Sequence, residues 1–149
     1  MISEKMEKLL NEQIQKEFYS AYFYLSMEAY LTSLNLNGFA NFFRVQTQEE
    51  RDHALIFFNY VNQVGAQVKL GAIDAPKFEF ASPLEVFEDA YKHEQFVTKS
   101  IYNIVDISLE EKDHKTNAFL QWFVTEQVEE EANMDNYIKK LKLIGNDGR

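Results

Sequence analysis

Cysteine is absent from the 149-residue sequence. Without thiolates, the chain cannot form disulfides, zinc–thiolate sites, iron–sulfur clusters or a rubredoxin-type module. Positive charge is also scarce, because 15 Lys and Arg are set against 24 Asp and Glu, for a formal net charge of −9. A nucleic-acid-binding protein is expected to have a basic patch or tail, and none is visible, so we expect no nucleic-acid partner. The acidic balance instead favours solubility and the attraction of cations.

Long apolar runs are also missing. No stretch approaches the roughly 20 apolar residues that a membrane-spanning helix needs, and the N-terminal residues do not resemble a signal peptide. We therefore expect a cytoplasmic protein with no membrane partner. A length of 149 residues, of which 46% are apolar, is enough for one domain, residues 1–149, with a substantial core.

Glycine and proline are few, with five Gly and two Pro, and none lies inside a segment of helical period. They divide the chain into four predicted helices, residues 4–34, 38–64, 83–110 and 114–144. Ser3 is the expected N-cap of the first, and residues 82–85 form a capping box with Pro at the first helical position of the third. Gly145 suits a left-handed cap after the fourth. Since no stretch predicts a strand, the fold class is all-α.

The connections predict the topology. Those between the first two and the last two helices are short, so each pair should be antiparallel neighbours. The connection over residues 65–82 could span about 60 Å if extended, whereas the helix before it is only about 40 Å long. It can therefore return along the whole bundle. The prediction is an antiparallel four-helix bundle with one long crossover between the second and third helices.

The second predicted helix has a Glu and a His in the middle of an otherwise apolar face. Along residues 39–64 the apolar positions recur in steps of three and four, and Glu50 and His53 fall on the same face, one turn apart. A buried ionised carboxylate is unfavourable unless it is paired or binds a metal. Helical bundles use Glu-x-x-His to bind iron or manganese. The pair alone is weak evidence, because this spacing also occurs by chance.

The other three helices have acids at matching positions. The apolar faces contain Glu17 in the first helix, Glu94 in the third and Glu130, one turn from Gln127, in the fourth. All lie near the midpoints of their helices, so they should meet at one level of the bundle. Without a cation these carboxylates would repel one another strongly. The pattern therefore predicts a carboxylate-rich metal site.

Several segments together resemble the bacterial non-haem ferritins, over residues 1–145. They are Gln13-Ile14-Gln15-Lys16-Glu17 with Tyr24 two turns on, Glu49-Glu50-Arg51-Asp52-His53-Ala54, Tyr91-Lys92-His93-Glu94, and Phe119-Leu120-Gln121-Trp122-Phe123 followed by Glu126-Gln127-Val128-Glu129-Glu130-Glu131. The fourth helix has Gln127-x-x-Glu130 in place of a second Glu-x-x-His. This departure argues against bacterioferritins, rubrerythrins and di-iron oxygenases, and Arg51 stands where a bacterioferritin has its haem-ligating Met.

The resemblance implies an iron-storage ferroxidase, which oxidises Fe(II) to Fe(III) with O2 at a di-iron centre within each subunit and stores the ferric mineral. It implies two irons per subunit and no haem. By the same resemblance Glu17 and His53 bind the first iron, Glu94 and Glu130 bind the second, and Glu50 bridges both. Oxygen and imidazole ligands suit Fe(II), although zinc or manganese could compete.

The resemblance also assigns residues around the centre. Gln127 is neutral and can orient a ligand or water without adding charge. Tyr24 would hydrogen-bond a ligand or donate an electron. A third iron site is implied at Glu49, Glu126 and Glu129. Taken by themselves, those three acids would usually be a solvated surface.

The resemblance also implies a homo-oligomer, in which two-fold dimers assemble into a cage of 24 subunits. The aromatic residues Phe78, Phe80 and Tyr102 fall outside the four apolar faces, and exposed apolar surface of this kind indicates an interface. We expect the dimer contact along the first two helices and the long connection. Related chains usually continue into a short fifth helix, and the sequence given ends at Arg149, so a cage with wider four-fold openings is expected.

Two other functions remain open. A di-iron oxidase or oxygenase acting on an organic substrate would need a substrate cavity beside the metals. A passive metal-buffering bundle would bind iron without rapid O2 uptake. His93 and His114 lie off the metal-bearing faces, and we expect both on the surface.

Overall fold

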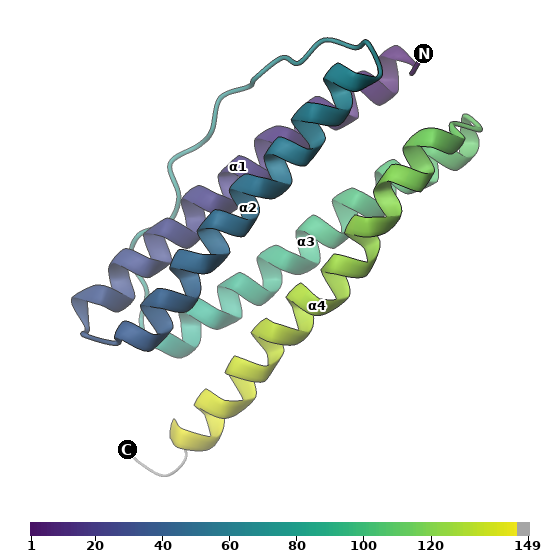
Figure 1. Cartoon of the computed structure of the whole chain (residues 1–149). Helices are drawn as coiled ribbons and strands as arrows, with labels where there is room; N and C mark the ends of the chain where they lie inside the picture. The colour runs from purple at the N-terminus through teal and green to yellow at the C-terminus, as the bar shows by residue number, and fades with distance from the viewer. Residues whose placement is uncertain (146–149) are drawn as a thin grey trace.

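The computed structural model describes residues 1–145, and within them it contains four helices and no strand (Figure 1). These are α1 (Glu4–Ser33), α2 (Asn37–Gln63), α3 (Pro83–Glu110) and α4 (His114–Gly145). The all-α prediction is confirmed, with helix ends within one residue of those expected. No helix in this part of the chain is both long and apolar enough to cross a membrane.

Two helix starts form as their sequences predict. Ser3 accepts a hydrogen bond from Met6 N at 3.0 Å and caps α1. Ser82 accepts from Glu85 N at 3.2 Å and caps α3, with Pro at the first turn. The Glu85 carboxylate returns to the backbone at the helix start, accepting from Ala81 N at 2.8 Å. These contacts satisfy backbone N–H groups that have no partner within the helix.

The expected left-handed glycine after α4 is not observed. Gly145 is the last helical residue, and among residues 1–145 the glycine with positive φ is Gly65, at +79°. Gly65 follows the end of α2, where its left-handed backbone lets the chain leave the helix and begin the long connection.

The long connection runs back along α1 to the start of α3, as Figure 1 shows. Hydrogen bonds hold it there at several points. Asn11 donates to Gln67 O at 2.9 Å and accepts from Lys69 N at 2.7 Å, while Ser26 donates to Lys77 O at 2.7 Å. The crossover prediction is therefore confirmed, and α2 and α3 run parallel.

The core consists of two apolar clusters separated by a polar layer. One cluster joins the start of α1 and the end of α2 to the end of α3 and the start of α4, and the other joins the opposite ends. Between them lies a layer of buried polar side chains at the middle of the helices, which includes Glu17, Glu50, His53, Glu94, Gln127 and Glu130. The sequence prediction that these residues meet at one level is confirmed.

Of the aromatic residues expected on the surface, Phe80 is buried. Its side chain is 9% exposed, against 73% for Phe78 and 46% for Tyr102. The Phe80 ring lies 5.3 Å from that of Tyr30, and the Lys77 ammonium lies 5.0 Å from its centroid. The connection folds back onto the bundle just before α3, so Phe80 closes that end of the core instead of facing solvent.

Candidate metal centre

Two groups of metal-ligating side chains occupy the polar layer and share one residue. One group is Glu17, Glu50 and His53, and the other is Glu50, Glu94 and Glu130; within each, one ligand atom per residue lies within 4.8 Å of the others. All five side chains are at most 3% exposed. Because Glu50 belongs to both groups, the geometry suits two adjacent metal ions that share its carboxylate.

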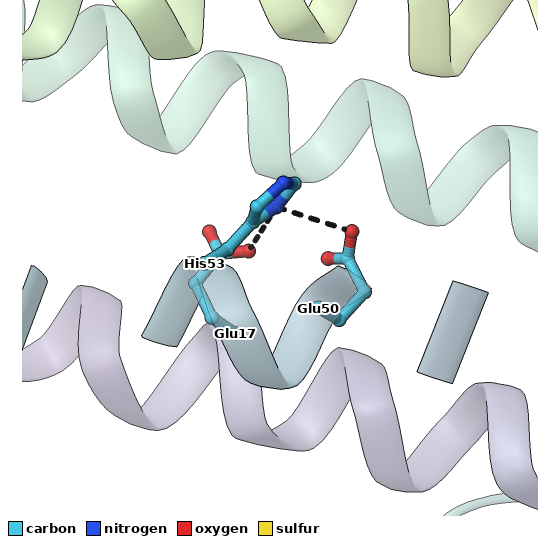
Figure 2. Close-up of side chains that lie close together, drawn as sticks. All are labelled: Glu17, Glu50 and His53. Atoms are coloured by element: carbon cyan, nitrogen blue, oxygen red, sulfur yellow. Dashed lines mark ion pairs between the residues drawn. The ribbon is translucent and has the colours of Figure 1, made fainter. Parts of the chain in front are cut away.

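The first group contains buried atoms without hydrogen-bond partners. His53 Nδ1 lies 3.3 Å from Glu50 Oε1 and 3.7 Å from Glu17 Oε1 (Figure 2). Four atoms are nevertheless unsatisfied: Glu17 Oε1, both carboxylate oxygens of Glu50, and His53 Nδ1. Each buried unsatisfied group costs about 1–3 kcal/mol, and a charged one more. Bound cations at this position and at the adjacent one would satisfy all four atoms.

The acids of the second group hold their protons to unusually high pH. Burial, followed by the charge of Glu94, raises the pKa of Glu50 well above its ordinary range. Burial and the neighbouring Glu130 raise the pKa of Glu94 to about 8. Burial, partly offset by a hydrogen bond from Gln46, raises the pKa of Glu130 to about 7. A divalent cation must therefore displace protons from this group near neutral pH.

His53 has the opposite tendency. Burial opposes the charged imidazole, but the carboxylates of Glu17 and Glu50 favour it more and raise the pKa of His53 to about 11. In the metal-free protein this imidazolium offsets part of the acidic charge. Its other nitrogen, Nε2, lies 3.5 Å from Glu126 Oε2. The ring of Trp122, itself 49% exposed, lies 5.5 Å from the His53 ring and covers it from outside.

Gln127 and Tyr24, both expected near the centre, contact Glu94. Gln127 Nε2 donates to Glu94 Oε1 at 3.1 Å and to the Glu94 backbone oxygen at 3.2 Å. Since the backbone oxygen can only accept, the amide nitrogen of Gln127 must face Glu94. The Tyr24 hydroxyl donates to the other carboxylate oxygen of Glu94. Both side chains thus hold a metal-ligating carboxylate.

The sequence analysis predicted no role for two further glutamines in the polar layer. Gln46 Nε2 donates to Glu130 Oε2 at 2.9 Å, and Gln13 Nε2 donates to Glu17 Oε2 at 2.6 Å. Both are buried. A usable indication was present, because each glutamine lies four residues before a glutamate of the layer on the same helical face.

The acids expected to form a third site line a surface pocket beside the centre. The pocket has a volume of about 400 Å³, and Glu49, Glu126 and Glu129 line it together with Glu130. Glu49 and Glu126 are half-buried and Glu129 is exposed. Burial raises the pKa of Glu49, the positive charge of His53 lowers it, and the charge of Glu126 raises it further. Among the described residues these three do not form a group as tight as the two buried ones.

His93 was expected on the surface, but the structure places it only partly there, because its side chain is half-buried at the contact of α1 with α3. Its ring lies 5.7 Å from that of Tyr19 and 5.9 Å from that of Tyr24, and its Nε2 lies 2.7 Å from Ser20 Oγ. Burial lowers the pKa of His93 to about 4. The contact of α3 with α1 is wider than the metal-bearing face, so it also covers the residue beside Glu94. His114 is exposed, as expected.

Comparison with known proteins gives consistent matches over nearly the whole chain. A family model described as the ferritin-like domain matches residues 7–144. The bacterial non-heme ferritin of Staphylococcus aureus (strain MRSA252) is 43% identical over 147 residues, spanning 99% of this chain and 89% of that protein. That of Campylobacter jejuni is 45% identical over 148 residues, with the same coverage of 99% and 89%.

Solved structures of ferritins also match this chain. An open pore ferritin from the hyperthermophilic archaeon Archaeoglobus fulgidus superposes with a TM-score of 0.97 at 52% identity, covering 99% of this chain and 91% of that one. The Chlorobium tepidum ferritin superposes with a TM-score of 0.95 at 39% identity, covering 97% and 88%. Sequence, fold and the buried layer of acids therefore point the same way, and the chain belongs to the ferritin family.

Proposed function

We propose that this protein oxidises Fe(II) to Fe(III) with O2 at the centre around Glu50 and stores the ferric product inside an assembly of identical subunits. The observation that supports this most is Glu50 itself, which lies in both ligand groups with both carboxylate oxygens unpartnered. Iron as the metal is supported by the relatives, which are named bacterial non-heme ferritins.

Each ligand has a distinct part in this proposal. Glu17 and His53 hold one Fe(II), Glu94 and Glu130 hold a second, and Glu50 bridges the two. The donor set of carboxylate oxygens with one imidazole nitrogen suits Fe(II). Two adjacent Fe(II) ions supply two electrons to O2, while the protein fixes their positions and excludes bulk water.

Gln127 and Tyr24 act through Glu94 in this scheme. The Gln127 amide orients the carboxylate without adding charge. Burial, followed by the charge of Glu94, raises the pKa of Tyr24 well above its ordinary value, so the phenol keeps its proton and remains a donor. The contact supports the hydrogen-bonding role expected for Tyr24.

Oxygen uptake tests the proposed activity. Metal-free protein is loaded anaerobically with two Fe(II) per subunit and then mixed with O2 in an oxygen electrode. Rapid consumption is expected, whereas uptake no faster than for free Fe(II) would indicate a passive metal buffer. An oxidase acting on an organic substrate is less well supported, because the pocket beside the centre is lined by four glutamates, Glu130 among them, and this acidic lining suits cations.

A third iron site at Glu49, Glu126 and Glu129 is part of the proposal, because these acids line the pocket beside the centre. Changing all three to Gln should leave the first two-iron oxidation largely intact, since the five buried ligands are untouched. Later turnover and the ratio of iron oxidised to O2 consumed should change. Stopped-flow absorbance and oxygen uptake measure these quantities.

The matched control changes three exposed acids, Glu4, Glu12 and Glu110, to Gln and removes the same charge from the surface. It should behave as the parent. Loss of the first oxidation event in the Glu49, Glu126 and Glu129 variant would instead place those residues in the primary centre.

Assembly through α1, α2 and the long connection is also proposed. An apolar pocket of about 300 Å³ lies there, lined in part by Tyr22, Leu25 and Ile73, which are 50%, 42% and 42% exposed. We expect a two-fold dimer at this face and a 24-subunit cage, measured by light scattering at micromolar concentration and neutral pH. Leu25→Glu should lower the mass of the assembly in solution, because the substitution would bury a charge at the dimer contact. A parent of monomer or dimer mass alone would contradict the cage.

A further inference from the structure

We propose that Gln13 is a positioning residue for Glu17. It holds one carboxylate oxygen of Glu17 and leaves the other for the metal, and Lys16 and Ser100 fix the direction in which the Gln13 amide points. The inference rests on the proposed function, because it assumes that Glu17 binds a metal ion.

The observation is a chain of hydrogen bonds that runs from the edge of the α1–α3 contact to the metal centre. Lys16 Nζ donates to Ser100 Oγ at 2.9 Å, Ser100 Oγ donates to Gln13 Oε1 at 2.6 Å, and Gln13 Nε2 donates to Glu17 Oε2 at 2.6 Å. Gln13 is 0% exposed and Glu17 is 1% exposed. The Lys16 ammonium also lies 5.6 Å from the centroid of the Phe96 ring, which favours its position at the outer end.

The two ends of the chain determine its direction. An ammonium group can only donate, so Ser100 Oγ accepts from Lys16 and has a single hydrogen left to give. The acceptor that this hydrogen reaches in the structure is Gln13 Oε1, at 2.6 Å. The amide nitrogen of Gln13 then faces Glu17, where it meets a carboxylate that can accept. The reversed amide would place its oxygen against the Glu17 carboxylate and its N–H groups against the Ser100 hydrogen.

The result is a difference between the two oxygens of Glu17. Oε2 is occupied by the Gln13 amide, whereas Oε1 is buried without a partner, 3.7 Å from His53 Nδ1. Glu17 therefore keeps one oxygen, Oε1, free of hydrogen bonds for a metal ion beside His53. Glu50 offers two, since neither of its oxygens accepts a hydrogen bond.

Gln46 provides a natural comparison. It donates to Glu130 Oε2 at 2.9 Å, in the other ligand group, and is buried like Gln13. The same substitution at the two glutamines should therefore affect different metal positions. Loss of a hydrogen-bond partner of a metal ligand typically lowers metal affinity about 10–100-fold.

The experiment is an anaerobic Co(II) titration of the assembled, metal-free protein, followed by visible absorption. Glu17→Ala and Glu130→Ala identify which binding step belongs to each ligand group. Gln13→Met, which keeps the side-chain length without an amide, should weaken the Glu17 step about 10–100-fold and shift its Co(II) absorption bands. Gln46→Met should weaken the Glu130 step instead. Ser100→Ala should act on the Glu17 step in the same direction as Gln13→Met, with a smaller effect.

Gln15→Met is the matched control, because Gln15 lies on the same helix but lines only surface pockets. It should bind Co(II) as the parent does. Parent-like binding by both Gln13→Met and Ser100→Ala, or equal weakening of both steps, would overturn the inference and leave the proposed centre intact. If Glu17→Ala itself leaves both steps unchanged, Glu17 is not a ligand, and the ligand set of the proposed function fails as well. Should Gln13→Met not fold, Ser100→Ala decides alone.

Discussion

Replacing Glu50 by Ala is expected to abolish the fast oxidation of Fe(II). Glu50 is the one residue common to both ligand groups, so its loss removes the carboxylate that would bridge the two iron positions. The initial rate should fall about 100-fold or more, because losing a shared ligand exceeds the roughly 10–100-fold effect of losing an outer hydrogen-bond partner. Stopped-flow absorbance and oxygen uptake at two Fe(II) per subunit measure the change.

The fold should survive this substitution. Both Glu50 oxygens are buried without partners, so removing them relieves repulsion and desolvation in the metal-free state. Asp52→Ala is the matched control, since Asp52 lies on the same helix but is exposed. It should keep the parent rate. If folded Glu50→Ala protein oxidises Fe(II) as fast as the parent, the di-iron proposal is wrong.

The second large effect concerns the metal-free protein. Its free energy of unfolding should fall as the pH rises, because the buried acids at its centre then lose their protons. The pKa values of Glu94 and Glu130 rise from 4.5 to about 8 and about 7 on folding. The folded state therefore holds more protons at these groups than the unfolded state does. Their contribution is most favourable below about pH 4.5 and is lost as the pH rises through 7 to 8. Urea unfolding in the presence of a chelator, at one protein concentration, measures this loss.

Glu130→Gln separates this effect from the titration of surface groups. The Gln side chain can still accept from Gln46 through its oxygen, while its NH2 group faces the remaining carboxylates. At pH 8 without metal, the variant should be more stable than the parent by up to about 3 kcal/mol, because the pKa of Glu130 rises from 4.5 to about 7 on folding and each pKa unit corresponds to about 1.4 kcal/mol. The difference should shrink at pH 5, where the parent's Glu130 is protonated.

Added Zn(II) should make the parent more stable than Glu130→Gln at pH 8, because only the parent retains the complete ligand group. Asp52→Asn, an exposed change on α2, should leave the difference between pH 5 and pH 8 unaltered. A Glu130→Gln protein that loses stability with rising pH as steeply as the parent would contradict the role given to this acid.

Much of the fold could be predicted from local patterns in the sequence. Scarce Gly and Pro at segment ends, caps at Ser3 and Ser82, and apolar positions in steps of three and four predicted all four helices. The same period placed Glu50 and His53 on one buried face, because residues three apart in a helix must point the same way. The length of the α2–α3 connection predicted the crossover. Which iron each ligand holds stays a prediction.

Contacts between helices could not be read from these patterns. Ser100 reaches Gln13 across 87 positions of the sequence, and Gln46 reaches Glu130 across 84. The burial of Phe80 and the partial burial of His93 were missed for the same reason.

The sequence by itself therefore determined the four helices, their order and the buried acids at one level, since helical period and connection length are local properties of the chain. Only the tertiary structure decided which oxygens of these acids accept hydrogen bonds and which have no partner, since this depends on how the packed helices are rotated and aligned against one another. The period of a single helix does not specify that alignment.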